Sequence, residues 1–116
     1  MKPEIVKGIL IDPDKQEIKE VTFPNNLDGY YELLGCDLID RVSIDDNNDL
    51  IVDDEGLFKG HETAFSIIGI EGMFVGKAVI VGVNPEEGEW VDCTLTDVKV
   101  QFYKKKEEDE DSESQD

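Results

Sequence analysis

Apolar and polar residues alternate along the first part of the chain in a pattern typical of paired strands. Residues 4–11 and 16–23 are rich in apolar side chains, and residues 12–15 between them read Asp-Pro-Asp-Lys. Proline presets φ for a tight turn, and an aspartate side chain can accept hydrogen bonds from nearby backbone N–H groups. The pattern therefore predicts an antiparallel β-hairpin.

A short helix is predicted after Pro24. Apolar side chains recur there at the three- and four-residue spacing of one helix face, at Leu27, Tyr30, Tyr31 and Leu34. Asn25 or Asn26 can cap the N-terminus of this helix, and Gly35 can end it. Gly29 costs roughly 1 kcal/mol relative to Ala inside a helix, so we expect the helix to depend on packing against a sheet.

The middle of the chain predicts further strands. Residues 38–44 and 50–52 form a second hairpin joined by the polar residues 45–49. Glycines interrupt residues 57–76 repeatedly, which predicts a wandering segment of short strands and turns. Residues 77–83 are almost continuously apolar and predict a buried strand that anchors the sheet.

The C-terminal part of the chain fits two patterns. Val98, Val100 and Phe102 alternate as in a strand, whereas Leu95, Val98 and Phe102 share one helical face. The elements together predict a small α+β domain with an antiparallel or mixed β-sheet and one short helix after the first hairpin. Its predicted core positions are Ile9, Ile11, Val21, Leu34, Ile39, Val79, Val81 and Trp90.

The composition of the chain predicts a disordered tail and a cytoplasmic location. The chain has 116 residues and 39% hydrophobic residues, enough for one modest core, which we assign to residues 1–103. Residues 104–116 read as lysines followed by acidic residues and predict a disordered tail. Neither an apolar run long enough to span a membrane nor a secretory signal is evident, so we expect a cytoplasmic protein without a membrane partner.

Acidic residues dominate the charge balance. There are 29 acidic and 11 basic residues, a net charge of -18, and without residues 104–116 the balance is still 22 to 8. A surface of this sign repels phosphate backbones and anionic membranes, which excludes direct nucleic-acid binding and favours a protein partner with a basic surface. The sequence is compatible with both a monomer and a homo-oligomer.

Two acidic segments make up the candidate protein-binding surface, which comprises Asp45, Asp46, Asp49, Asp53, Asp54, Glu55, Glu86, Glu87 and Glu89. An EF-hand calcium loop beginning at Asp45 fails, because Leu50 stands where glycine belongs and Gly56 stands where glutamate belongs. The first segment is therefore interpreted as a solvated hairpin tip, and we expect neither a metal nor another cofactor.

Catalytic motifs are missing from the sequence. His61 is the single histidine, and neither a GxSxG nucleophile motif nor a phosphate-binding loop is present. Cys36 and Cys93 form no CxxC pair and are expected to be buried free thiols. We therefore expect a binding protein and not an enzyme.

A small-nucleotide pocket is an alternative binding site. The basic or titratable side chains available for it in the middle of the chain are Arg41, Lys59, His61 and Lys77. Such side chains could contact phosphates while a nearby aromatic ring stacks on the base.

The order of motifs resembles the domain of unknown function 3846 family. The residues that carry the resemblance are Ile-Leu-Ile-Asp-Pro at 9–13, the predicted helix at 27–35, the segment 50–60 with its Asp-Asp-Glu-Gly turn, and Gly-Lys-Ala-Val-Ile-Val-Gly-Val at 76–83. The resemblance covers roughly residues 7–95. It implies an accessory protein of a bacteriophage or mobile element and brings no catalytic residues.

Three hypotheses for function follow from these observations. In the first, the acidic protein mimics DNA and inhibits or redirects a host protein with a basic, nucleic-acid-binding surface, in a counter-defence or host-takeover role. In the second, it is a sponge that sequesters a small nucleotide signal. In the third, it is a structural or regulatory module.

Overall fold

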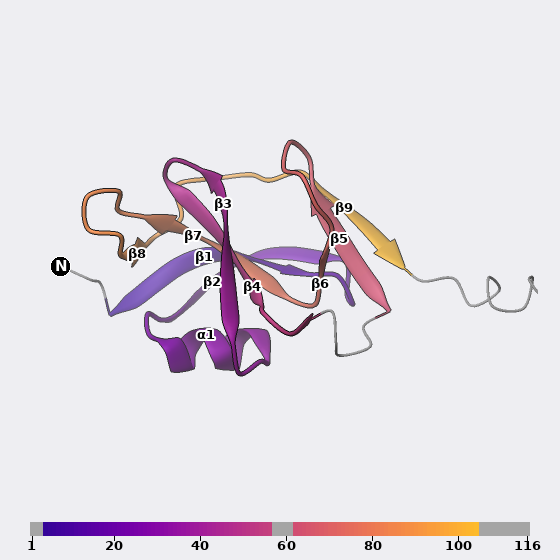
Figure 1. Cartoon of the computed structure of the whole chain (residues 1–116), viewed down its shortest axis with the longest axis horizontal. Coiled ribbons are helices and arrows are strands. Elements are labelled where there is room, and N and C mark those ends of the chain that lie inside the picture. The colour runs from indigo at the N-terminus through magenta and orange to yellow at the C-terminus, as the bar shows by residue number, and fades with distance from the viewer. Residues whose placement is uncertain (1–3, 57–61, 105–116) are drawn as a thin grey trace, which may run out of the picture.

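Two antiparallel β-sheets and one short helix make up the computed structural model, which describes residues 4–56 and 62–104 (Figure 1). The elements in chain order are β1 (Ile5–Asp12), β2 (Glu17–Pro24), α1 (Leu27–Leu34), β3 (Ile39–Asp45), β4 (Asn48–Asp53), β5 (Thr63–Ile67), β6 (Phe74–Val75), β7 (Ala78–Val83), β8 (Trp90–Val91) and β9 (Val100–Lys104). The predicted α+β fold with a helix after the first hairpin is confirmed.

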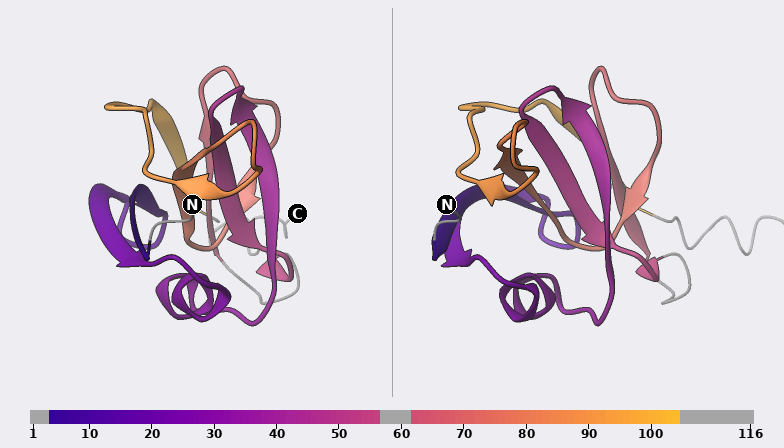
Figure 2. Two further views of the ribbon diagram at one scale, coloured as in Figure 1. Left: turned by 90° about the vertical axis from the view of Figure 1, so that its left-hand side faces the viewer. Right: turned by 60° about the vertical axis from the view of Figure 1, so that its left-hand side comes forward.

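The larger sheet has the strand order β2-β1-β7-β4-β3, and β8 pairs with the end of β7. The smaller sheet has the order β6-β5-β9. Figures 1 and 2 show α1 beneath the larger sheet and the strands β5 and β9 on its other side. The larger sheet is therefore covered by the helix on one face and by the smaller sheet on the other.

Strand β7 is the anchor of the larger sheet, as predicted. Val79 and Val81 belong to the apolar cluster on the α1 side, whereas Ala78 and Ile80 belong to the cluster beneath the smaller sheet. Successive side chains of a strand point to opposite faces, so a strand covered on both faces must be apolar at every position. This double burial explains the continuous apolar run.

The helix α1 has the predicted end signals. Asn26 is its N-cap, and the Oδ1 atom of Asn26 accepts a 2.7 Å hydrogen bond from the Gly29 backbone N–H. Gly35 ends the helix in the left-handed conformation, with a φ of 67°. Asn25, the alternative cap, is buried and donates from Nδ2 to the Trp90 carbonyl oxygen at 2.9 Å.

The second hairpin has a tighter turn than the sequence predicts. Asp45 pairs with Asn48, so Asn48 and Asp49 belong to β4 and only two residues form the turn. Asn48 is buried because its amide group is satisfied: Nδ2 donates to the Thr94 Oγ1 at 2.7 Å, and Oδ1 accepts from the Thr94 backbone N–H at 3.1 Å. The predicted solvated tip is therefore wrong for these two residues.

The C-terminal segment contains a strand at residues 100–104, and residues 92–99 before it form neither a helix nor a strand. Strand β9 pairs along its whole length with β5, from Thr63 with Lys104 to Ile67 with Val100. Lys104 thus belongs to β9, one residue beyond the predicted domain boundary, and residues 105–116 lie outside the described residues.

The eight predicted core positions all lie in or against the two apolar clusters. Four of them are buried, namely Ile11, Leu34, Val79 and Val81, and four are half-buried, namely Ile9, Val21, Ile39 and Trp90. Within residues 4–56 and 62–104, no helix has the length and apolar character needed to cross a membrane.

Candidate acidic surface and helix-cap cavity

Two acidic turns lie side by side at one end of the larger sheet. Because β4 and β7 pair antiparallel, with Asn48 opposite Gly82, the β3–β4 turn meets the β7–β8 turn. The Val83 backbone N–H donates to the Asn47 carbonyl oxygen at 2.8 Å and joins the two turns. We call their acidic residues the turn surface, which consists of Asp45, Asp46, Glu86, Glu87 and Glu89.

The acidic residues at 53–55 do not join this surface. Strand β4 separates them from the β3–β4 turn, and its six residues span about 20 Å at 3.3 Å per residue. Asp53 is also buried, and its Oδ1 accepts a 2.9 Å hydrogen bond from the Glu55 backbone N–H. The nine predicted acids therefore do not form one surface, because neighbours in sequence lie at opposite ends of a strand.

Asp49 does not belong to the acidic surface either. It is only 5% exposed, and its Oδ2 accepts hydrogen bonds from the Arg41 Nη1 at 3.2 Å and the Trp90 Nε1 at 3.3 Å. A buried carboxylate requires such donors to offset its lost hydration. The placement of Asp49 among the surface acids is corrected: it is a structural carboxylate that holds Arg41 and Trp90 in place.

A cavity of about 480 Å³ opens beside this carboxylate, and we call it the helix-cap cavity. It is lined by residues 25–27 and Tyr30 at the start of α1, by Arg41 of β3 and by residues 88–90 after the β7–β8 turn. Its elements come from three separate parts of the sequence. The third of these, the β7–β8 turn, also carries part of the turn surface.

The structure brings one of the four predicted nucleotide-pocket residues to this cavity. Arg41 lines it, whereas Lys77 is exposed just before β7 and does not line it. Lys59 and His61 lie outside the described residues. The two aromatic residues of the lining are Tyr30 and Trp90. In the sequence both are candidates for a ring that stacks on a base as well as for the core.

Tyr30 lines the cavity and is fully buried. Its ring packs edge-on against Phe23, with centroids 4.9 Å apart, and at a tilt against Trp90, with centroids 4.7 Å apart. No hydrogen-bond partner reaches its Oη atom. Burial, and then the negative charge of Asp49, raise the pKa of the Tyr30 hydroxyl, so this group stays neutral and protonated in the folded domain.

The raised Tyr30 pKa predicts a loss of stability in alkaline solution. Above the ordinary value of 10.0 the unfolded chain releases this proton while the folded domain keeps it, so the free energy of unfolding falls as pH rises. The fall is at most about 1.4 kcal/mol per pH unit. Urea titrations between pH 9 and 11 measure it, and Tyr30→Phe is expected to give the shallower slope. Identical slopes for the two proteins would contradict a buried hydroxyl.

Neither Cys36 nor Cys93 forms a disulfide. Cys36 is buried, and Cys93 is half-buried, with its Sγ donating to the Leu95 carbonyl oxygen at 3.7 Å. Burial raises the pKa of the Cys93 thiol, which disfavours the reactive thiolate. Within the described ranges, no three His, Cys, Asp or Glu side chains gather as a ligand set for a metal ion.

The chain matches the model of a known protein family. The model of a domain of unknown function (DUF3846) matches residues 6–107, nearly the whole described fold. The chain belongs to the DUF3846 family. The resemblance inferred from the sequence motifs is thus confirmed at the level of the family, and the matched span of this DUF3846 domain includes the turn surface and the helix-cap cavity. No curated protein and no solved structure matches the chain.

Proposed function

We propose that this DUF3846 domain is a binding protein whose turn surface engages the basic surface of a partner protein. The observation that carries the proposal is the contact between the two acidic turns, where the Val83–Asn47 hydrogen bond gathers carboxylates from positions about forty residues apart. The net charge of -18 extends this local field over a longer range and speeds encounter with a cationic partner.

The partner proposed here is a bacterial host protein that normally holds nucleic acid in a basic groove. Carboxylates on the turn surface take the place of phosphates, and the domain inhibits or redirects that protein as an accessory factor of a bacteriophage or mobile element in the cytoplasm. The acidic composition supports this role, because a DNA mimic competes for a basic groove and does not itself bind DNA. Binding, not catalysis, is the activity.

Charge-neutralising variants test this proposal. We expect the tagged domain to capture its partner from bacterial lysate, and the triple variant Asp46→Asn, Glu86→Gln, Glu87→Gln to bind that partner at least about tenfold more weakly. These three side chains are exposed, so the loss reports on charge and not on folding.

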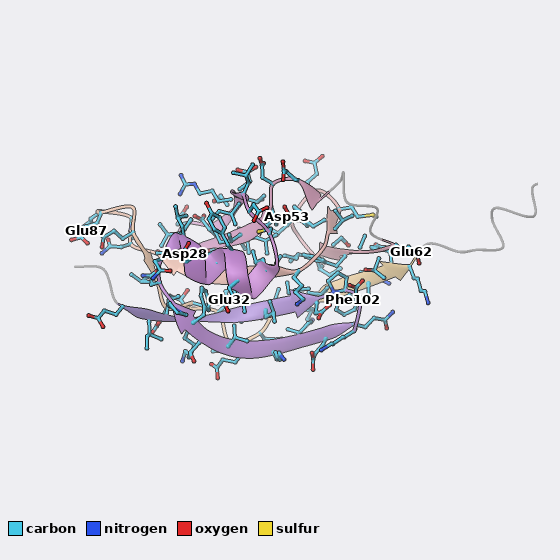
Figure 3. All side chains as sticks on the ribbon, turned by 90° about the horizontal axis from the view of Figure 1, so that it is seen from below. Asp28, Glu32, Asp53, Glu62, Glu87 and Phe102 are labelled. Atoms are coloured by element: carbon cyan, nitrogen blue, oxygen red, sulfur yellow. The ribbon has the colours of Figure 1, made fainter. Side chains whose placement is uncertain are left out.

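The matched control removes the same charge elsewhere. Asp54, Glu55 and Glu62 are exposed acids away from the turn surface, and Figure 3 shows Glu62 at the opposite end of the molecule from Glu87. Neutralising these three residues is expected to change the affinity less than about threefold. Equal losses from the two triple variants would show that total charge, and not the turn surface, governs binding.

A further inference from the structure

We propose that the helix-cap cavity takes an arginine side chain of the partner protein as the anchor of the complex. This inference rests on the proposed function and names the chemistry that the partner presents at that end of the domain. Its starting point is a pair of buried side-chain atoms without a hydrogen-bond partner. Among the described residues these are Tyr30 Oη and Glu89 Oε1, and both residues line the same cavity.

An unsatisfied pair of this kind is a candidate position for a hydrogen-bonding ligand. Buried polar atoms in folded proteins nearly always have partners, because a desolvated atom without one destabilises the fold. The Glu89 oxygen can only accept a hydrogen bond when ionised, so its partner must be a donor. The Tyr30 hydroxyl oxygen has lone pairs that can accept a hydrogen bond from another N–H group of the same ligand.

A guanidinium group has the chemistry that both atoms and the aromatic lining of the cavity call for. It is planar, carries five N–H donors in a fork that matches a carboxylate, and stacks on aromatic rings. Trp90 supplies such a ring, half-buried beside Tyr30 and Glu89. A cation over its face gains further electrostatic attraction.

The charges around the cavity favour a cation over an anion. Arg41 is already engaged, because its Nη1 lies 3.2 Å from the Asp49 Oδ2. At the start of α1, the Asn26 side chain accepts from the Gly29 backbone N–H, and Asp28 places a negative charge in the first turn. Glu89 therefore leaves the cavity with an excess negative charge, which the neighbouring acids of the turn surface increase.

The cavity wall is held in place before any ligand binds. The Trp90 carbonyl accepts from Asn25 Nδ2 at 2.9 Å, and the Trp90 indole donates to Asp49 at 3.3 Å. The Glu89 carbonyl accepts from the Asn84 backbone N–H at 2.9 Å, which closes the β7–β8 turn. Trp90 and the backbone of the β7–β8 turn thus need little ordering on binding, which favours affinity.

The single tryptophan of the chain makes the test specific. The full chain has one indole N–H signal in a ¹⁵N–¹H spectrum, and that signal belongs to Trp90. Titration with N-acetyl-arginine amide is expected to shift it saturably, whereas the capped citrulline analogue, which has the same shape and no charge, does not. Glu89→Gln is expected to weaken the arginine affinity about tenfold and Tyr30→Phe about threefold, and Glu62→Gln leaves it unchanged.

Three outcomes would contradict the proposal that the helix-cap cavity binds an arginine side chain. The first is an indole signal that does not shift when capped arginine is added, and the second is equal affinity for capped arginine and capped citrulline. The third is a shift produced by guanosine monophosphate in place of arginine, which would make the cavity a nucleotide site. The proposed function fails separately, when partner capture does not respond to the triple variant Asp46→Asn, Glu86→Gln, Glu87→Gln. An arginine-specific shift supports the cavity even in that case.

Discussion

Replacing Val81 with Asp is expected to prevent folding of the domain. Val81 is fully buried in β7, between β1 and β4 at the centre of the larger sheet. An unpaired carboxylate in such a position costs several kcal/mol, a large part of the 5–15 kcal/mol that stabilises a typical domain. The pairing register adds a second cost, because Val81 lies directly opposite Asp49, whose carboxylate is itself buried.

Circular dichroism and thermal melting measure this effect. The Val81→Asp chain is expected to lack a cooperative melting transition. Ile68→Asp is the matched control, because Ile68 is 64% exposed, and its melting temperature is expected to stay within a few degrees of the parent. A soluble Val81→Asp variant that melts cooperatively would show that β7 is not the centre of the fold.

Replacing Gly29 with Ala is expected to destabilise the domain by about 1–3 kcal/mol. Helix propensity alone predicts the opposite, a gain of roughly 1 kcal/mol. The difference arises because a Cβ atom on Gly29 would lie 2.1 Å from the Pro24 carbonyl oxygen, where α1 packs closely on the end of β2. This glycine is required by the close approach of two backbone segments.

Urea denaturation tests this prediction through the transition midpoint. Gly29→Ala is expected to lower the midpoint, whereas Glu32→Ala, an exposed position of the same helix, changes it by less than the equivalent of about 0.5 kcal/mol. A Gly29→Ala variant as stable as the parent would mean that α1 can move away from Pro24 without loss.

The elements predicted correctly from the sequence have local signals. The first hairpin depends on Asp12, whose Oδ1 accepts from the backbone N–H groups of Asp14 and Lys15 inside the turn. The helix α1 is capped by Asn26 and Gly35, through contacts that span at most five residues. Such signals lie within a few neighbouring positions, so the sequence carries them directly.

The candidate site depends on contacts between distant residues. The two turns of the turn surface meet only because β4 pairs with β7, and no spacing in the sequence encodes that pairing. Asp49 looks like its acidic neighbours, yet it is buried because Arg41 and Trp90 donate to it from other strands. The cavity was missed for the same reason, since Tyr30 and Glu89 lie far apart along the chain.

The C-terminal segment shows how a tertiary partner selects between two local patterns. In the sequence, Val98 and Phe102 fit both a strand and a helical face, and in the structure Phe102 lies in β9 whereas Val98 precedes it. Strand β5 offers a free edge, and pairing with that edge satisfies the backbone groups of β9 while Val100 and Phe102 pack against the second apolar cluster. Pairing with the edge of β5 therefore selects the strand conformation for residues 100–104.

The most direct test of the central claim is the salt dependence of the affinity for the captured partner. The dissociation constant is measured from about 0.05 to 0.5 M salt, a range in which the screening length falls to about 4 Å. Binding by the turn surface predicts a steep loss of affinity for the parent and a clearly shallower dependence for Asp46→Asn, Glu86→Gln, Glu87→Gln. An affinity that does not change with salt, or equal slopes for the two proteins, would contradict binding through the turn surface.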